Sequence, residues 1–62
     1  MKPKAIMVGE NGNVFNLMGI ARRALRDIDR IDLADEMIQK ITHTAKSYDE
    51  ALRIMMEYVD IE

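Results

Sequence analysis

The stretch Asp27-Ile28-Asp29-Arg30-Ile31 decides the fold, because one long helix would have to become two there. It contains no glycine or proline, so local sequence alone would let a helix continue through it. The apolar residues before it and after it both recur at helical intervals, but at about 100° per residue the two sets point roughly 150° apart. A straight helix cannot bury both sets against one core. The sequence therefore predicts two helices that separate within residues 27–31.

Each of these two predicted helices has its own apolar stripe. We expect Asp32 or Asp29 to cap the second helix, with Asp35 and Glu36 close to its positive end. The first stripe consists of Val14, Leu17, Met18, Ala21, Leu25 and Ile28, and the second of Ile31, Ala34, Met37, Ile38, Ile41 and Ala45.

A third helix is predicted from the capping box Ser47-Tyr48-Asp49-Glu50. In such a box the Ser47 hydroxyl and the Glu50 carboxylate each accept a hydrogen bond from the other residue's backbone amide. The apolar face of this helix would then be Ala51, Leu52, Met55 and Val59.

A strand is predicted at residues 4–8, since Pro3 is tolerated at a strand start and the β-branched Ile6 and Val8 share one face. The glycine- and asparagine-rich residues 9–13 form a turn, and Asn13 is placed to cap the first helix. The rival prediction makes residues 13–17 a second strand, because their side chains also alternate; the longer helical periodicity favours the helix.

A second strand is predicted to begin near Tyr58, because Val59 and Ile61 alternate with acidic residues. Asp60 and Glu62 would complement Lys2 and Lys4 if the two terminal strands were neighbours. The three helices between the strands favour a parallel pair over an antiparallel one, which stays open, and the sheet could instead extend across a dimer axis. The predicted fold is thus a single α+β domain over residues 1–62: a strand, three short helices and a C-terminal strand, with the terminal strands paired.

Composition excludes several kinds of site. The 62 residues include no cysteine and one histidine, His43, so disulfides and the usual zinc sites are not expected. Nine basic and eleven acidic residues give a net charge of −2, which lacks the basic excess typical of nucleic-acid and membrane-surface binding. No stretch has the apolar length of a signal peptide or a membrane span. We expect a cytoplasmic protein with no cofactor, no metal and no membrane partner.

Several stretches together resemble a family of short uncharacterised bacterial proteins, some of them from mobile-element or phage-like settings. The similarity is strongest at the Val-Gly-x-x-Gly-Asn turn and next strongest at the acidic Tyr-Val tail. It implies no function, and Asp27-Ile28-Asp29 stands where the family leads us to expect a glycine-containing turn. The stretches are Lys2-Pro3-Lys4, Val8-Gly9-Glu10-Asn11-Gly12-Asn13-Val14-Phe15, Ala24-Leu25, Ser47-Tyr48-Asp49 and Met56-Glu57-Tyr58-Val59.

The turn between the first strand and the first helix is a candidate anion site, because backbone amides at a helix start can bind phosphate. The motif is incomplete: no lysine or hydroxyl residue follows as in a phosphate-binding loop, and Glu10 would repel an anion. A purely structural turn is the favoured interpretation. The candidate residues are Gly9, Asn11, Gly12 and Asn13.

Four arginines form a candidate nucleic-acid face: Arg22, Arg23, Arg26 and Arg30. Arg22 and Arg26 lie one turn apart on one side of the predicted helix. Acidic neighbours such as Asp27 and Asp29 could pair with them, so a solvated, locally paired face is the favoured interpretation. Nucleic-acid binding is the alternative.

Six methionines suggest a protein interface, since methionine adapts to irregular partner surfaces. Met18, Met37 and Met55 fall on the core stripes, whereas Met7 and Met56 do not. The candidate interface is Met7, Met56 and Tyr58, and it could join two copies of the chain. His43 suits the end of the second helix, and the acidic pairs suit helix starts, so we expect no enzyme. The prediction is a protein-interaction or regulatory module with an unidentified protein partner.

Overall fold

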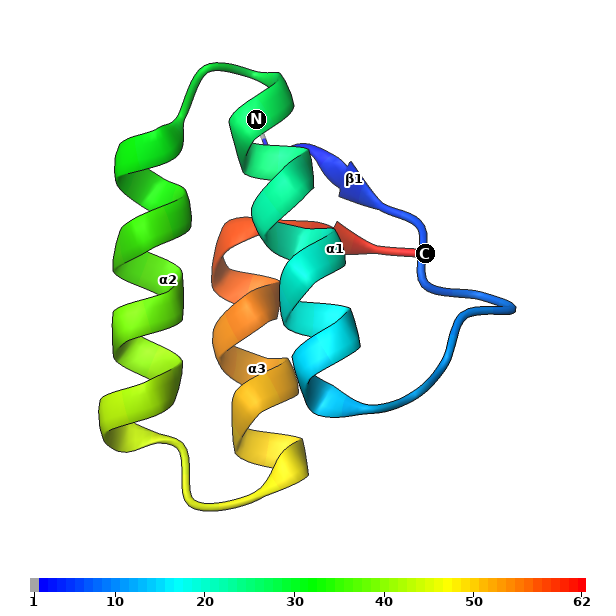
Figure 1. Cartoon of the computed structure of the whole chain (residues 1–62), viewed down its shortest axis with the longest axis vertical. Coiled ribbons are helices and arrows are strands. Elements are labelled where there is room, and N and C mark those ends of the chain that lie inside the picture. Colours follow the sequence, from blue (N-terminus) through cyan, green and yellow to red (C-terminus); the bar gives the residue numbers. More distant parts are fainter. Residues whose placement is uncertain (1) are drawn as a thin grey trace.

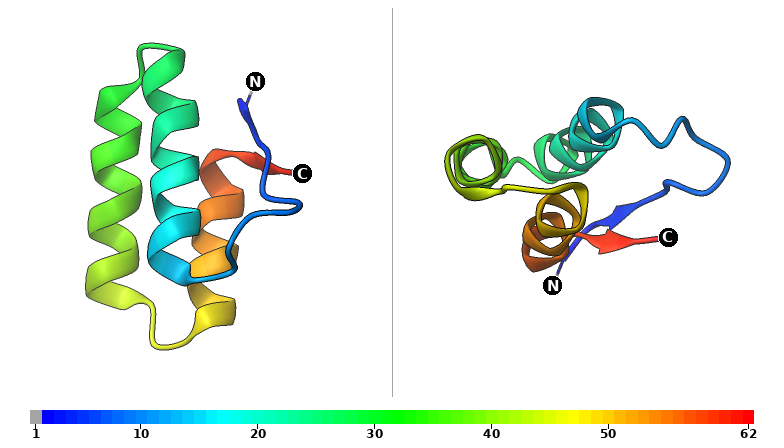
Figure 2. Two further views of the ribbon diagram at one scale, coloured as in Figure 1. Left: turned by 45° about the vertical axis from the view of Figure 1, so that its right-hand side comes forward. Right: turned by 90° about the horizontal axis from the view of Figure 1, so that it is seen from below.

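Three helices and two short strands follow one another in the order strand, helix, helix, helix, strand (Figure 1). They are β1 (Lys4–Ala5), α1 (Val14–Asp27), α2 (Ile31–Thr44), α3 (Tyr48–Tyr58) and β2 (Asp60–Ile61) in a computed structural model that describes residues 2–62. The helices pack side by side, and the two-stranded sheet lies on the side away from α2 (Figure 2). The predicted α+β fold with paired terminal strands is confirmed.

The two strands pair in parallel, which is the arrangement that the sequence favoured, with Lys4 opposite Asp60 and Ala5 opposite Ile61. Both strands are shorter than expected. The Met7 and Val8 amides both donate to the Glu62 carbonyl oxygen, at 2.6 and 3.0 Å, so the chain turns out of the ladder there. At the other end α3 continues through Tyr58, and the Val59 N–H still donates a helical hydrogen bond to the Met55 carbonyl oxygen. The strand β2 therefore begins only at Asp60.

The buried face of the first strand is the opposite of the one that carries Ile6 and Val8. Ala5 is 1% exposed and Met7 is half-buried, whereas Ile6 and Val8 are 53% and 78% exposed. The expected charge pairing holds in part. Lys4 Nζ lies 3.7 Å from Glu62 Oε2, but Lys2 Nζ donates to the Met56 carbonyl oxygen at 2.8 Å.

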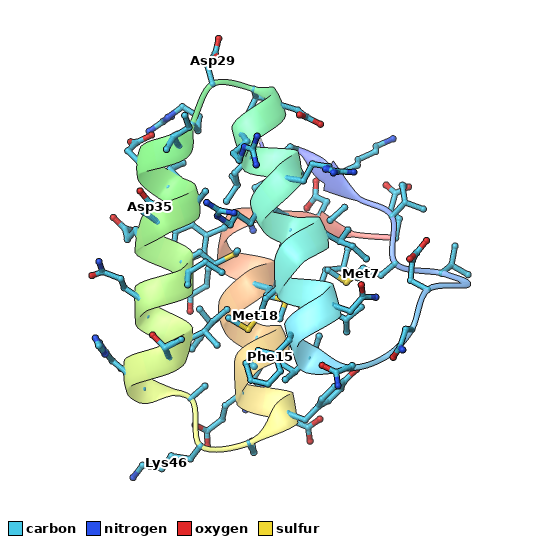
Figure 3. All side chains as sticks on the ribbon, in the orientation of Figure 1. Met7, Phe15, Met18, Asp29, Asp35 and Lys46 are labelled. Carbon is cyan, nitrogen blue, oxygen red and sulfur yellow. The ribbon has the colours of Figure 1, made fainter. Side chains whose placement is uncertain are left out.

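The break between the first two helices occurs where it was predicted, and it is a Schellman-type turn. Arg30 N–H donates to the Leu25 carbonyl oxygen and Asp29 N–H to that of Arg26, both at 2.9 Å. Asp29 has φ 60°, the left-handed conformation that glycine adopts most easily. An aspartate therefore occupies a position that glycine usually takes, and its side chain points away from the helices (Figure 3).

The start of α2 differs from the prediction. Its N-cap is Arg30, which makes no side-chain capping bond, and neither Asp29 nor Asp32 caps the helix. The Arg30 guanidinium instead donates to both Asp32 carboxylate oxygens, at 3.1 and 3.0 Å. These hydrogen bonds lower the pKa of Asp32 and raise that of Arg30. Since φ 60° at Asp29 belongs to the end of α1, that residue is not free to adopt a cap conformation for α2.

The other two helix starts follow the prediction closely. Asn13 Oδ1 accepts from Phe15 N–H at 2.8 Å, so residues 14–17 are helical and the rival strand is wrong. Ser47 Oγ accepts from Glu50 N–H at 3.1 Å. The Glu50 carboxylate, however, accepts from Lys46 N–H at 3.0 Å and not from Ser47, so the return bond of the capping box is displaced by one residue.

One cluster of buried side chains lies between the three helices and the sheet, and Met18, Met37 and Met55 belong to it as predicted. Ile54 is also buried, although the sequence did not place it on the apolar face of the third helix. Ile28 and Ile31 are 46% and 57% exposed because they lie at the α1–α2 reversal, beyond the helical contacts. The cluster comprises Ala5, Leu17, Met18, Ala21, Leu25, Ala34, Met37, Ile41, Ala51, Ile54, Met55 and Val59.

Two side-chain contacts join α2 to the end of α3. Lys40 Nζ donates to Glu57 Oε1 at 2.7 Å, and the Tyr58 hydroxyl donates to Glu36 Oε2 at 2.7 Å. The hydrogen bond to this carboxylate raises the pKa of Tyr58 to about 12. The phenol therefore holds its proton more tightly in the folded protein than in the unfolded chain.

We expect Asp29→Gly to leave stability unchanged or raise it, and Asp29→Val to lower it by about 1–2 kcal/mol, because a β-branched residue is strained at positive φ. Urea unfolding followed by circular dichroism measures both. Equal effects of glycine and valine would contradict the Schellman turn.

We expect Tyr58→Phe to lower stability by about 0.5–1.5 kcal/mol at neutral pH, through loss of the bond to Glu36. The contribution of this bond is complete below about pH 10, the unfolded pKa of tyrosine, and is lost as the pH rises toward the folded pKa. The difference in unfolding free energy between wild type and Tyr58→Phe, measured by urea unfolding, should therefore narrow between about pH 10 and pH 12, the range between the unfolded and the folded pKa. A difference that stays constant over this range would show that it does not come from the hydrogen bond that the Tyr58 hydroxyl donates to Glu36.

Candidate functional site

Phe15 is the chain's one phenylalanine, and its side chain is 74% exposed. It lies in the first turn of α1, beside Met18 and facing α2 (Figure 3). Phe15 lines three neighbouring surface hollows. A large aromatic side chain is thus held at the meeting point of three concave regions while contributing little to the core.

The first hollow, the Phe15 groove, runs between α1 and α2 and has a volume of about 510 Å³. Its walls combine apolar side chains with one charge of each sign, Arg22 and Asp35. The lining residues are Phe15, Met18, Gly19, Arg22, Asp35, Ile38 and Gln39.

The second hollow, the basic hollow, lies between α1 and the loop that follows β1 and has a volume of about 590 Å³. It brings together three of the four arginines predicted as a nucleic-acid face. The loop contributes the negative charge of Glu10, and α1 contributes the positive charges of the arginines. The lining residues are Ile6, Glu10, Phe15, Asn16, Gly19, Ile20, Arg22, Arg23 and Arg26.

The third hollow is the most apolar of the three and lies at the end of the helices near the α2–α3 loop. Tyr48, 46% exposed, joins Phe15 there. The Tyr48 hydroxyl oxygen would lie 3.7 Å from a Cβ placed on Gly12, so α3 and the turn before α1 approach each other at this point. The lining residues are Val14, Phe15, Met18, Ile41, Thr42, Ala45, Ser47, Tyr48 and Ala51.

The arginines of α1 are not locally paired as the favoured interpretation required. Among residues 2–62, no carboxylate lies within ion-pair distance of Arg22, Arg23 or Arg26. The predicted contacts of Arg23 with Asp27 and of Arg26 with Asp29 are absent from this set. Only Arg30 is paired, with Asp32, and it lines a separate hollow near Lys2 and Tyr58. Three free guanidinium groups therefore share one side of α1.

Four of the residues described above lie along one line of α1. Phe15, Gly19, Arg22 and Arg26 are spaced by four, three and four residues, which is the spacing of one helical face. We name this line the Phe15–Arg26 stripe. It lies about 100° around the helix from the buried stripe, so folding does not cover it.

Gly19 stands in the middle of this stripe and has no structural explanation within the chain. A Cβ at this position would meet nothing within 4 Å, and the residue has ordinary helical geometry. Glycine inside a helix costs about 1 kcal/mol relative to alanine. The helix thus bears this cost without gaining a close internal contact.

The predicted anion turn is built mainly from hydrogen bonds within itself. Asn11 Oδ1 accepts from Asn13 N–H, and Asn16 Nδ2 donates to the Asn11 carbonyl oxygen, each at 2.8 Å. Gly9 has φ 79°, which explains that glycine by backbone conformation. With the Phe15 amide also donating to Asn13, two amides that an anion would need are already engaged. Anion binding at Gly9, Asn11, Gly12 and Asn13 stays a prediction.

The predicted interface residues are placed in different environments. Met7 and Tyr58 are half-buried and pack against the core, whereas Met56 is 54% exposed. No hollow described above includes Met7 or Met56. Their role as an interface stays a prediction.

Phe15 and Gly19 were missed as candidate site residues, although the sequence contained the signal for both. Each falls outside the predicted stripe of the first helix, and an aromatic residue and a glycine at such positions have no role in the core. The hollows beside them could not be predicted from the sequence, because they depend on where α2 and the β1–α1 loop lie in the fold.

Within residues 2–62 no helix has the length and hydrophobicity needed to cross a bilayer. The same residues contain no group of three histidine, cysteine or acidic side chains arranged to hold a metal ion.

We expect Gly19→Ala to raise the free energy of unfolding by about 0.5–1 kcal/mol, because alanine is the better helix former and its methyl group meets no neighbour. Urea unfolding measures the change. The matched control is Gly9→Ala, which should destabilise the protein because φ is 79° there. A loss of stability in Gly19→Ala would show that this glycine is needed by the fold.

In comparisons with known proteins, no protein-family model matches this chain, and no curated protein and no solved structure is significantly similar to it. The resemblance to a family of short bacterial proteins stays a prediction, and a function must be inferred from the chain's own residues.

Proposed function

We propose that this chain is a small cytoplasmic, non-enzymatic module that binds another protein through the surface around Phe15. The observation that carries the proposal is the 74% exposure of Phe15 at the meeting point of three hollows. Aromatic residues are enriched at the centres of protein interfaces. Location in the cytoplasm is supported by the cysteine-free composition, which suits a reducing compartment.

The energetics favour a protein partner. Burying a phenylalanine side chain contributes about 1.5–3 kcal/mol, and this chain leaves most of that gain unrealised in its own fold. Tyr48 and Met18 line the apolar hollow beside Phe15, so a partner side chain entering there would contact three large apolar groups. A partner can thus recover free energy that folding does not use.

A second copy of the chain is one such partner, as the sequence suggested. In the parallel sheet the backbone groups of Pro3 and Ala5 face β2, so those of Lys4 and Ile6 point to the outer edge. Lysine on an edge strand disfavours strand-to-strand association. A homodimer is therefore better supported through the Phe15 surface than through the sheet edge.

Nucleic acid is the second candidate partner, and the unpaired guanidinium groups of Arg22, Arg23 and Arg26 are the observation that favours it. Phosphate contacts would make such binding strongly salt-dependent. Against it stand the net charge of −2 and the acidic Glu10 in the same hollow.

We expect Phe15→Ser to abolish partner capture without unfolding the domain. The tagged protein would be chemically cross-linked in a lysate of the organism that encodes it, with and without nuclease, and its adducts identified by mass spectrometry. The matched control is Val8→Ser, which removes an apolar side chain of similar exposure, 78%, outside the three hollows.

Adducts that survive nuclease, are lost in Phe15→Ser and remain in Val8→Ser would support the proposal. A self-adduct with this dependence would identify the partner as a second copy. Adducts that are unaffected by Phe15→Ser would contradict the proposal. Adducts that form only when nucleic acid is intact would favour nucleic-acid binding by the arginines.

A further inference from the structure

The Phe15–Arg26 stripe has a polarity that restricts what can bind to it. At a rise of about 1.5 Å per residue, Arg22 lies roughly 10 Å along α1 from Phe15, and Arg26 roughly 16 Å. The stripe is therefore apolar at its N-terminal end and cationic at its C-terminal end. Gly19, between the two, leaves open space above the helix backbone.

Open space at Gly19 is what close approach of a second helix requires. Phe15, Gly19 and Arg22 line both the Phe15 groove and the basic hollow, so they form the ridge between the two. A ridge whose middle residue has no side chain is lowered at that point. A partner helix can cross there with its backbone close to α1, while its side chains enter the hollows on either side.

The positive charges of Arg22 and Arg26 favour a partner that presents carboxylates. Arg22 and Arg26 lack ion-pair partners in residues 2–62, and guanidinium groups bind carboxylates through paired hydrogen bonds. A phosphate backbone would bring many negative charges past both Glu10 and Asp35, which line the two hollows. It would also leave the exposed ring of Phe15 without an apolar counterpart. The mixture favours an acidic protein segment over nucleic acid.

From these observations we infer that the partner presents an acidic amphipathic helix, which crosses α1 at Gly19 with apolar side chains on Phe15 and carboxylates on Arg22 and Arg26. This inference rests on the proposed protein-binding function and names the partner class for the same surface. Phe15 is the apolar anchor, the arginines set the direction of the partner helix, and Gly19 sets how closely it approaches.

The probe is a fluorescein-labelled synthetic helical peptide with leucines at i, i+3, i+4 and i+7 and glutamates over the following two turns. We expect saturable binding by fluorescence anisotropy, weakened at least tenfold by Phe15→Ser. The double variant Arg22→Gln/Arg26→Gln should weaken binding by about tenfold and remove most of its salt dependence. The matched charge control is Arg53→Gln, on the exposed side of α3, which should change affinity less than about twofold.

Gly19→Ala separates close approach from fold stability. It should weaken peptide binding by about fivefold or more, although the variant unfolds at a higher urea concentration. Unfolding of each variant by circular dichroism shows that the losses of affinity are not losses of structure. Unchanged affinity in Gly19→Ala would overturn the crossing at this residue.

The charge inference has its own contrary outcomes. Equal binding of a peptide with lysine in place of glutamate, or no saturable binding of the acidic peptide, would overturn it. Displacement of the acidic peptide by random duplex DNA at comparable concentration would assign the arginines to nucleic acid. If Phe15-dependent protein adducts persist while the acidic peptide fails, only the partner class is wrong; if those adducts are also absent, the proposed function fails with it.

Discussion

Two backbone hydrogen bonds at the end of α1 hold the reversal on which the arrangement of the three helices depends. The Arg30 and Asp29 amides donate back to the Leu25 and Arg26 carbonyl oxygens, with Asp29 in the left-handed conformation. This turn makes α1 and α2 antiparallel, so two apolar stripes that point in different directions on one straight helix can face a common core. Leu25, the last buried residue of α1, is fully covered immediately before the reversal.

The terminal strands close the structure from the other side. Only two residue pairs form the sheet, and a two-stranded sheet has little stability by itself. Its stability must come from packing of the terminal segments against the helices: Ala5 in β1 and Val59 just before β2 are each 1% exposed and belong to the core cluster. The Glu62 carbonyl oxygen accepts both the Met7 and Val8 amides, which fixes where the first loop begins. That loop forms one wall of the basic hollow, so the contact between the two terminal segments also shapes the candidate site.

The helices could be predicted well because the helical spacing of their apolar residues can be recognised in the sequence without knowledge of the tertiary contacts. Helical phase placed the α1–α2 break, and the asparagine and serine caps placed two helix starts. The same reasoning failed where two local signals compete. Asp29 was predicted as a possible cap for α2, but the backbone required it at the end of α1. The first strand was predicted to be longer than it is, because the alternation of side chains in residues 4–8 does not indicate where the partner strand ends.

The candidate site was predictable only in part, for a related reason. The arginines were recognised from their spacing, but their lack of partners depended on side-chain geometry that spacing does not determine. Acidic neighbours in the sequence suggested local pairing for all four arginines, yet within residues 2–62 only Arg30 is paired, with Asp32. The hollows that give the arginines and Phe15 a common surface are formed with α2 and the β1–α1 loop, which are distant in sequence.

Phe15 and Gly19 share one property: at each position another residue type would suit folding better. Elsewhere in α1, residues agree with helix formation and burial: Ala21 and Leu25 are fully buried, and Asn13 caps the first turn. Phe15 leaves most of its aromatic ring exposed, and Gly19 weakens the helix without a close internal neighbour that would offset the cost. Sequences that fold well usually satisfy local and global preferences at once, and departures from this consistency concentrate at functional sites. Two such departures lie four residues apart on one helical face, beside arginines that have no ion-pair partner among residues 2–62, and this combination is the reason for proposing this surface as the binding site.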